Sequence, residues 1–137
     1  MTSRIAILAI ALAAACTSTQ SQASPDDDGV SLAHSPAAPS PGESVTLVLR
    51  NESDAAIGYN LCTSGLFRQS GAEWEQVPED RICTLELRIL PPGEQADFTL
   101  QLPLGLESGT YRYQTSIDGP GTGESGQVSA PPFAVSD

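Results

Sequence analysis

The sequence predicts an antiparallel β-sandwich of about seven to nine strands. Short segments alternate apolar with polar residues, which gives each strand one face for a core and one for water. Proline, glycine, asparagine and aspartate separate these segments at intervals of about 8–15 residues. No convincing amphipathic helix interrupts them. These patterns indicate one all-β domain over residues 29–137.

The first half of this domain begins with a predicted strand over Val30–His34, which a proline-rich stretch interrupts. The next strand has a strongly apolar face made of Val45, Leu47 and Leu49. A turn follows at 51–54 and a third strand at 57–61. A hairpin around Ser70-Gly71 is then expected, with its two strands over residues 66–68 and 74–77.

The second half contains the cleanest alternation in the chain. Four side chains on one face of this predicted strand are expected to point into the core: Cys83, Leu85, Leu87 and Ile89. Pro91-Pro92-Gly93 ends the strand, because proline has no N–H for a ladder and glycine permits the turn. Further strands are expected over residues 96–102, 111–117 and 127–135. Pro131-Pro132 requires the last one to lie at an edge or to contain a bulge.

The first sixteen residues resemble the signal of a bacterial lipoprotein. Arg4 precedes an apolar run from Ile5 to Ala15 that is too short to cross a bilayer as a helix. Small residues stand directly before Cys16, the predicted lipidation site, although Ala13 occupies a position that usually holds leucine. The resemblance implies a signal peptide over 1–15 and durable attachment by several acyl chains. Residues 16–28 are then the lipidated cysteine and a flexible linker, because 17–28 are polar and show no apolar periodicity. The alternative is an ordinary secretory signal cleaved near Ala23.

The net charge bears on the possible partners, and the residue after Cys16 bears on the location. Seventeen acidic and six basic residues give a formal net charge of −11. A negative net charge argues against nucleic acid or anionic lipid as a partner, because both would be repelled. It is typical of a solvated acidic surface, and a cationic partner remains open. Thr17 takes the place of the aspartate that commonly retains lipoproteins at the inner membrane. The expected location is therefore the periplasmic face of the outer membrane or the cell surface.

Three cysteines are present, and lipidation of Cys16 leaves Cys62 and Cys83. An exported protein meets an oxidising compartment, so this pair predicts a disulfide. A metal site is not expected, because no CxxC spacing occurs and the chain has only one histidine, His34. A cupredoxin would need two. The acidic run Asp26–Asp28 is expected to be solvated linker rather than a calcium site.

The motifs of the common enzyme classes are absent from the sequence. His34 has no G-x-S-x-G nucleophile motif to serve, and no P-loop or dinucleotide-binding glycine pattern occurs. Pairs of carboxylates exist, but none has a distinctive spacing. We therefore expect no catalytic residues and no cofactor.

The order of several short motifs is similar to that of bacterial immunoglobulin-like domains, over about residues 29–136. The similarity lies in a Pro-Gly-Glu opening with its strand, a mid-domain Leu-x-Pro-Gly-Glu turn, a Leu-x-x-Gly-x-Tyr entry and a closing strand, at residues 41–51, 90–94, 106–113 and 132–135. The resemblance implies a tyrosine corner, in which the Tyr111 hydroxyl bonds to upstream backbone. It also implies a disulfide around a Gly-x-x-Trp hairpin, with Trp74 packing there rather than contacting a ligand.

These features predict a non-enzymatic, lipid-anchored module of the cell envelope, which binds or supports another component through loops or a sheet edge. The partner is expected to be a protein. The alternative is a proteinase inhibitor, since one bacterial inhibitor family has a similar sandwich. It would use an exposed loop, and three are candidates: Asn51–Ala56, Ser64–Gly71 and Asp118–Gly126.

Overall fold

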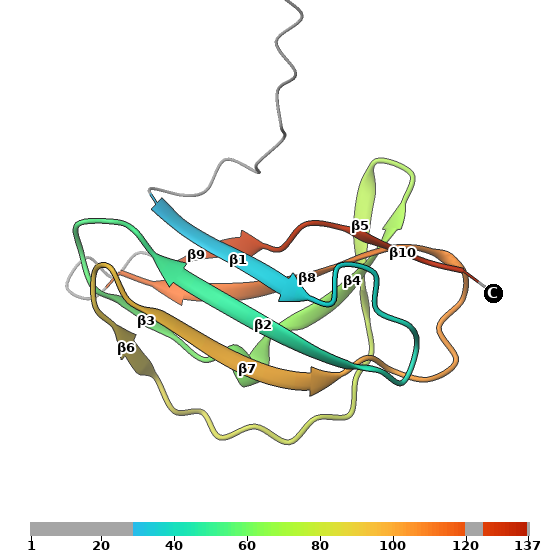
Figure 1. Ribbon diagram of the computed structural model, residues 1–137, viewed down its shortest axis with the longest axis horizontal. Helices are drawn as coiled ribbons and strands as arrows, with labels where there is room; N and C mark the ends of the chain where they lie inside the picture. Colours follow the sequence, from blue (N-terminus) through green and yellow to red (C-terminus); the bar gives the residue numbers. More distant parts are fainter. Residues whose placement is uncertain (1–28, 120–124, 137) are drawn as a thin grey trace, which may run out of the picture.

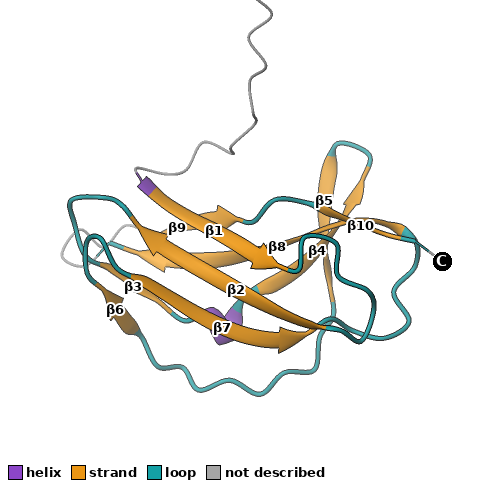
Figure 2. Ribbon diagram, viewed as in Figure 1, coloured by secondary structure: helices purple, strands orange, loops and turns teal. Residues whose placement is uncertain are grey.

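The computed structural model describes residues 29–119 and 125–136 and confirms the all-β prediction. Antiparallel strands form two sheets of an open sandwich, with one short 3-10 turn, η2 (Leu61–Thr63), between two of them (Figures 1 and 2). Ten strands are present in the described residues, slightly more than expected: β1 Val30–Ser35, β2 Ser44–Asn51, β3 Ile57–Tyr59, β4 Gly65–Ser70, β5 Glu73–Val77, β6 Arg88–Leu90, β7 Gln95–Gln101, β8 Gly109–Asp118, β9 Ser125–Ser129 and β10 Phe133–Val135.

The smaller sheet has the order β1-β2-β7, so one edge of β7 is free. The larger sheet is built around β8. Strands β4 and β3 follow one another along one edge of β8, and β10 and β9 follow one another along the other. Strand β5 lies outside β4, and β6 lies outside β3. The outer edge of the larger sheet is therefore formed in turn by β5 and β6.

The core lies between the sheets and is formed by the faces that the strongest alternations predict. Val45, Leu47 and Leu49 are completely buried, and the inward residues of β8 face them. Those residues are Tyr111, Tyr113, Thr115 and Ile117, all of which are at most 8% exposed. Both strands lie inside their sheets, where burying one face removes apolar surface from water and dominates stability.

The last predicted strand is divided in two, as its prolines require. Ala130 still donates its N–H to the Tyr113 carbonyl oxygen at 2.8 Å, and the ladder resumes at Phe133 opposite Tyr111. The Pro131 carbonyl oxygen lies 2.9 Å from the Nε2 atom of His34 on β1. The break in the strand is therefore held to the other sheet by an imidazole, and His34 has a structural contact here.

A buried amide holds one end of the sandwich together. Asn51 is 0% exposed, and its side-chain Nδ2 donates to the carbonyl oxygens of Ala55 and Leu90, at 2.8 and 3.0 Å. Its Oδ1 accepts from the Ser53 N–H and hydroxyl. These contacts join the end of β2 to the end of β6. Leu90, whose carbonyl they hold, is the buried residue of β6.

The predicted strand over residues 83–89 is wrong in both its extent and its inward face. Only Arg88–Leu90 forms a strand, and its buried residue is Leu90, at 3% exposed. Leu85, Leu87 and Ile89 are 95%, 56% and 54% exposed, although they were expected in the core. The reason is one of register. Leu90 lies opposite Ile57 of β3 in the core, so residues at odd positions before it face outward.

The Tyr111 hydroxyl donates to the Glu107 carbonyl oxygen at 2.7 Å, which is the contact expected of a tyrosine corner. Tyr113 offers a matched comparison two residues further along the same face. Its hydroxyl is also buried but has no hydrogen-bond partner among the described residues. One face of β8 thus carries one satisfied and one unsatisfied phenol.

We predict opposite effects for removing these two hydroxyls. Tyr111→Phe breaks a hydrogen bond and leaves the Glu107 carbonyl without it, so the free energy of unfolding should fall by about 1 kcal/mol. Tyr113→Phe removes a buried donor that has no partner, so stability should stay constant or increase. Urea unfolding followed by tyrosine and tryptophan fluorescence measures both. Equal losses for the two variants would contradict the assignment.

Candidate functional site

The outer edge of the larger sheet is interrupted between β5 and β6. Val77 is paired with Leu66, and Arg88 is paired with Tyr59. The ten residues 78–87 therefore face only the six residues 60–65, and four surplus residues cannot lie in a regular ladder. This stretch, which we call the pinned segment (residues 78–87), bows away from the sheet in an extended course beside β7 (Figure 1).

A disulfide between Cys62 and Cys83 fastens the middle of the pinned segment, with 5.8 Å between the two Cα atoms. The predicted pairing is therefore confirmed. Cys62 lies in η2, where the line of β3 and β4 is itself broken. The bond lies midway in the mismatch, so the surplus residues divide evenly on its two sides. Cys83 does not belong to a strand, contrary to the prediction.

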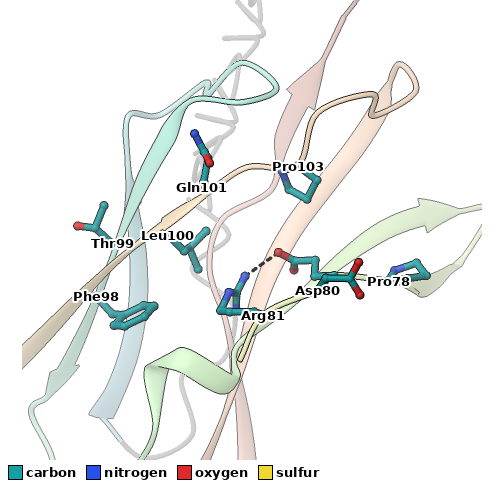
Figure 3. A pocket seen from close by; sticks show the side chains of 9 residues that line it. Pro78, Asp80, Arg81, Phe98, Thr99, Leu100, Gln101 and Pro103 are labelled. Atoms are coloured by element: carbon teal, nitrogen blue, oxygen red, sulfur yellow. Dashed lines mark hydrogen bonds and ion pairs between the residues drawn. The ribbon is translucent and has the colours of Figure 1, made fainter. Parts of the chain in front are cut away.

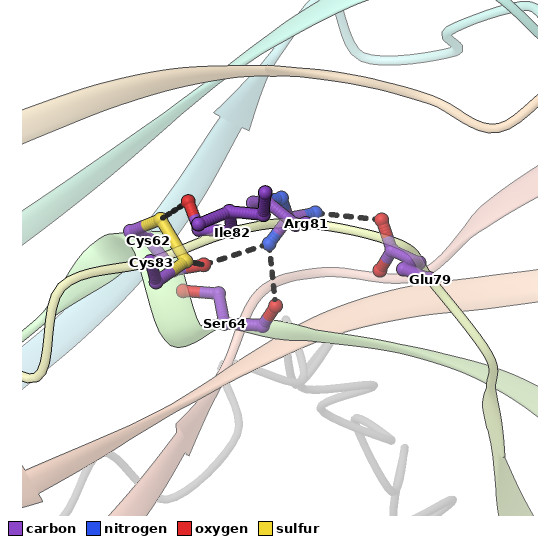
Figure 4. Close-up of polar contacts among 6 residues, drawn as sticks. All are labelled: Cys62, Ser64, Glu79, Arg81, Ile82 and Cys83. Atoms are coloured by element: carbon purple, nitrogen blue, oxygen red, sulfur yellow. Dashed lines mark hydrogen bonds and ion pairs between the residues drawn. A yellow bond between two sulfur atoms is a disulfide. The ribbon is translucent and has the colours of Figure 1, made fainter.

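Polar side chains replace the missing ladder bonds on either side of the disulfide, and Figure 4 shows the contacts on the Arg81 side. Arg81 Nη1 donates to the carbonyl oxygens of Cys62 and Ser64, at 2.8 and 3.0 Å. Its Nη2 pairs with Glu79 Oε2 at 2.6 Å. Asn60 Nδ2 donates to the Thr84 carbonyl oxygen at 2.7 Å. The pinned segment is therefore held at several points, although none of its residues belongs to a strand.

We call the disulfide and the contacts of Asn60, Glu79 and Arg81 the clasp. Burial changes the acid–base properties of Glu79 within it and of the nearby Tyr113. The Glu79 side chain is only 12% exposed, and desolvation raises the pKa of its carboxyl above the usual value, although Arg81 opposes the increase. Burial also raises the pKa of the Tyr113 phenol, to which the Glu79 charge adds.

Two hollows separate the pinned segment from the free edge of β7. The larger has a volume of about 520 Å³ and lies between residues 78–81 and the stretch from Phe98 to Pro103 (Figure 3). The smaller, of about 360 Å³, is lined by the disulfide, Glu86, Arg88, Asp97 and Phe98. Phe98 lies between the two. The open side of the sandwich therefore has a mixed polar and apolar lining.

The outward face of this edge is strongly apolar. Ile82 is 100% exposed, and beyond the disulfide Leu85, Leu87 and Ile89 form an exposed row that we call the apolar stripe. Leu87 also covers the backbone of β3, because a Cβ at Gly58 would lie 2.9 Å from its Cδ1 atom. A clasped segment that shows apolar side chains to water is typical of a binding surface.

Other candidates from the sequence are found away from this edge or outside the described residues. Cys16, the linker, Asp26–Asp28 and most of the loop after Asp118 lie outside them. Trp74 is covered by the Arg112 guanidinium, 4.1 Å from the ring centroid, which supports a packing role. Of the inhibitor loops, Asn51–Ala56 is held by the Asn51 amide, and Ser64–Gly71 is mostly strand β4.

Within residues 29–119 and 125–136, no group of three or more histidine, cysteine, aspartate or glutamate side chains could hold a metal ion. No helix in that part of the chain has the length and hydropathy needed to span a membrane.

No protein-family model matches the chain. No curated protein matches it. Several solved structures match the chain, including two at low identity. A Bordetella pertussis protein assigned as ApaA is 18% identical with a TM-score of 0.48, over 77% of this chain and 87% of that one. A β-glucosidase from Listeria innocua, in complex with gluconolactone, is 18% identical with a TM-score of 0.32, over 76% of this chain and 16% of that one.

Loss of the disulfide should loosen the pinned segment more than the core. Replacing Cys62 and Cys83 by serine opens a loop of about 20 residues, and the unfolding free energy should fall by about 3 kcal/mol in the chain-entropy model. Amide hydrogen exchange should accelerate most over residues 78–87 and least in β8. Uniform acceleration throughout the chain would contradict a local clasp, as would free thiols at both cysteines of the native protein.

The Glu79 carboxyl makes stability depend on pH. Its pKa is higher in the folded than in the unfolded chain. Above the usual value of 4.5, the folded chain therefore keeps this proton while the unfolded chain has lost it. The wild type should therefore lose stability relative to Glu79→Gln, beginning near that pH and ending above the raised pKa. Thermal unfolding of both proteins across this range measures the difference. A constant difference would contradict the shift.

Proposed function

We propose that this chain is a non-enzymatic, immunoglobulin-like module of the bacterial cell envelope, tethered through lipid on Cys16, which binds a protein partner through the pinned segment and β6. The observation that carries the proposal is the exposure of Ile82 and the apolar stripe on a segment fastened by a disulfide. Leaving such side chains in water is unfavourable, and a partner that covers them recovers that free energy.

The clasp supports binding in a second way. Arg81, the disulfide and Asn60 fix the backbone of the segment before any partner arrives. Ordering a flexible loop on association costs conformational entropy, so a segment that is already fixed loses less. The free edges of β6 and β7 on the same side add unpaired backbone groups that an extended chain can bond.

The position of the anchor is compatible with this surface. The described chain begins at the end of the sandwich where Val30 lies opposite Asn51, whereas the β4–β5 hairpin projects near the opposite end (Figure 1). The pinned segment runs along the side between these two ends. A tether at the Val30 end therefore leaves this side of the sandwich open to a neighbour.

Two experiments on the full chain in an exporting bacterium test the proposal. Metabolic labelling with a fatty-acid analogue should mark the wild type, and Cys16→Ser should abolish the label. Cross-linking in native membranes, followed by quantitative mass spectrometry, should then identify a partner that Leu85→Asp loses. Leu104→Asp is the matched control, because Leu104 is 83% exposed but lies in a different loop.

Three results would contradict the proposal. The first is an unlabelled wild type. The second is a set of cross-linked proteins that Leu85→Asp and Leu104→Asp leave equally unchanged. The third is an enzymatic turnover of the purified chain that a single side-chain substitution abolishes. Inhibition of a serine or cysteine protease by the purified chain would instead support the inhibitor alternative.

A further inference from the structure

We infer that the partner of this edge is a second copy of the same chain, joined by antiparallel pairing of residues 84–90 about a two-fold axis at Leu87. The inference rests on the proposed function, because it assigns an occupant to the same surface. It starts from β6, which pairs with β3 on one side and has no strand on the other. A free edge with exposed apolar side chains is a template for another strand.

The sequence of this edge is complementary to itself when read in the opposite direction. With Leu87 opposite Leu87 of the second copy, Glu86 lies opposite Arg88 and Leu85 lies opposite Ile89. The ion pair of Glu86 with Arg88 occurs twice, once on each side of the axis, as a two-fold interface requires. Opposite charges in directly paired positions favour the pairing of two strands, and like charges oppose it.

The charged side chains of Glu86 and Arg88 and the apolar stripe are both accessible to a second copy. The side chains of Arg88 and Glu86 are 66% and 63% exposed, and their own ion pair is long, at 3.9 Å. Because both side chains are already exposed and weakly paired, each can turn toward the second copy without losing a buried contact. The apolar stripes of the two copies would lie side by side on one face of the joined sheets, and each would shield the flank of the other from water.

The tether does not prevent this arrangement. Val30 lies opposite Asn51, whose amide bonds the Leu90 carbonyl, so the entry point of the chain is near Leu90. Leu90 is three residues from the axis, or about 10 Å, which separates the two entry points by about 20 Å along the strands. A linker of twelve residues can span up to about 40 Å. One membrane can therefore hold both copies.

Cysteine cross-linking in the membranes of the host tests the axis. In an antiparallel pair the Cα atoms of directly opposite residues are about 4.5–5.5 Å apart, within the range that a disulfide spans. Leu87→Cys in the full chain should therefore form a dimer that reduction separates, with at least about five times the yield of Leu104→Cys. Equal yields from the two variants would overturn the inference.

Charge exchange tests the register in the Leu87→Cys background. Glu86→Arg places like charges opposite each other at two pairs, and so does Arg88→Glu, so each alone should lower the dimer yield about five-fold. When the two variants are co-expressed with tags of different size, every pair across the axis is again of opposite sign. The heterodimer should then form at nearly the yield of the parent.

This rescue separates a loss of pairing from a loss of folding, because a misfolded variant would not be rescued by another. Formation of the Cys62–Cys83 bond in each variant provides a further check on folding. A heterodimer yield no higher than that of the single variants would overturn the inference. The proposed function would survive that result if Leu85→Asp still lost a different protein, and both would fail if it lost nothing.

Discussion

The open side of this sandwich depends on a mismatch in length along one sheet edge. Ten residues of the pinned segment face six residues around η2, so a continuous ladder from β5 to β6 cannot form. The disulfide lies midway in the mismatch and keeps the surplus close to the sheet. Arg81 donates to carbonyl oxygens that the broken ladder would otherwise leave unbonded. The result is an extended backbone that is fixed in place yet keeps much of its apolar surface in water.

The sequence allowed prediction of the inward face for strands that lie inside their sheets, such as β2 and β8. Val45, Leu47 and Leu49 are one such case, since two of the three residues that alternate with them are polar. The segment ending in Ile89-Leu90 lies at the sheet edge, and its apolar face stays exposed although it alternates clearly, because Leu90 rather than Ile89 enters the core. A contact from far along the chain decides the choice, namely the pairing of Leu90 with Ile57 of β3. Local periodicity does not contain that information.

The disulfide of the candidate site could be predicted from the sequence, whereas the side chains that hold the pinned segment beside it could not. The disulfide followed from the number of cysteines and the expected compartment. Arg81 and Asn60 could not be found in the same way, because both donate to backbone carbonyl oxygens. Any residue supplies such an acceptor, and only the break at η2 makes these particular ones available. The exposed stripe was missed because the same alternation that identifies a strand does not say which face the core covers.

An exposed apolar edge normally favours pairing with many other strands. The charged residues on this edge decide which pairings are favoured. Charges of one sign along the edge would repel every copy, whereas Glu86 and Arg88 alternate in sign. Moving the two-fold axis by one residue, to either 86 or 88, places two like charges opposite each other. Leu87 is thus the centre that satisfies both ion pairs, and the neighbouring registers are opposed by repulsion. The same two residues that make self-association favourable also limit it to one alignment, which distinguishes a specific contact from aggregation.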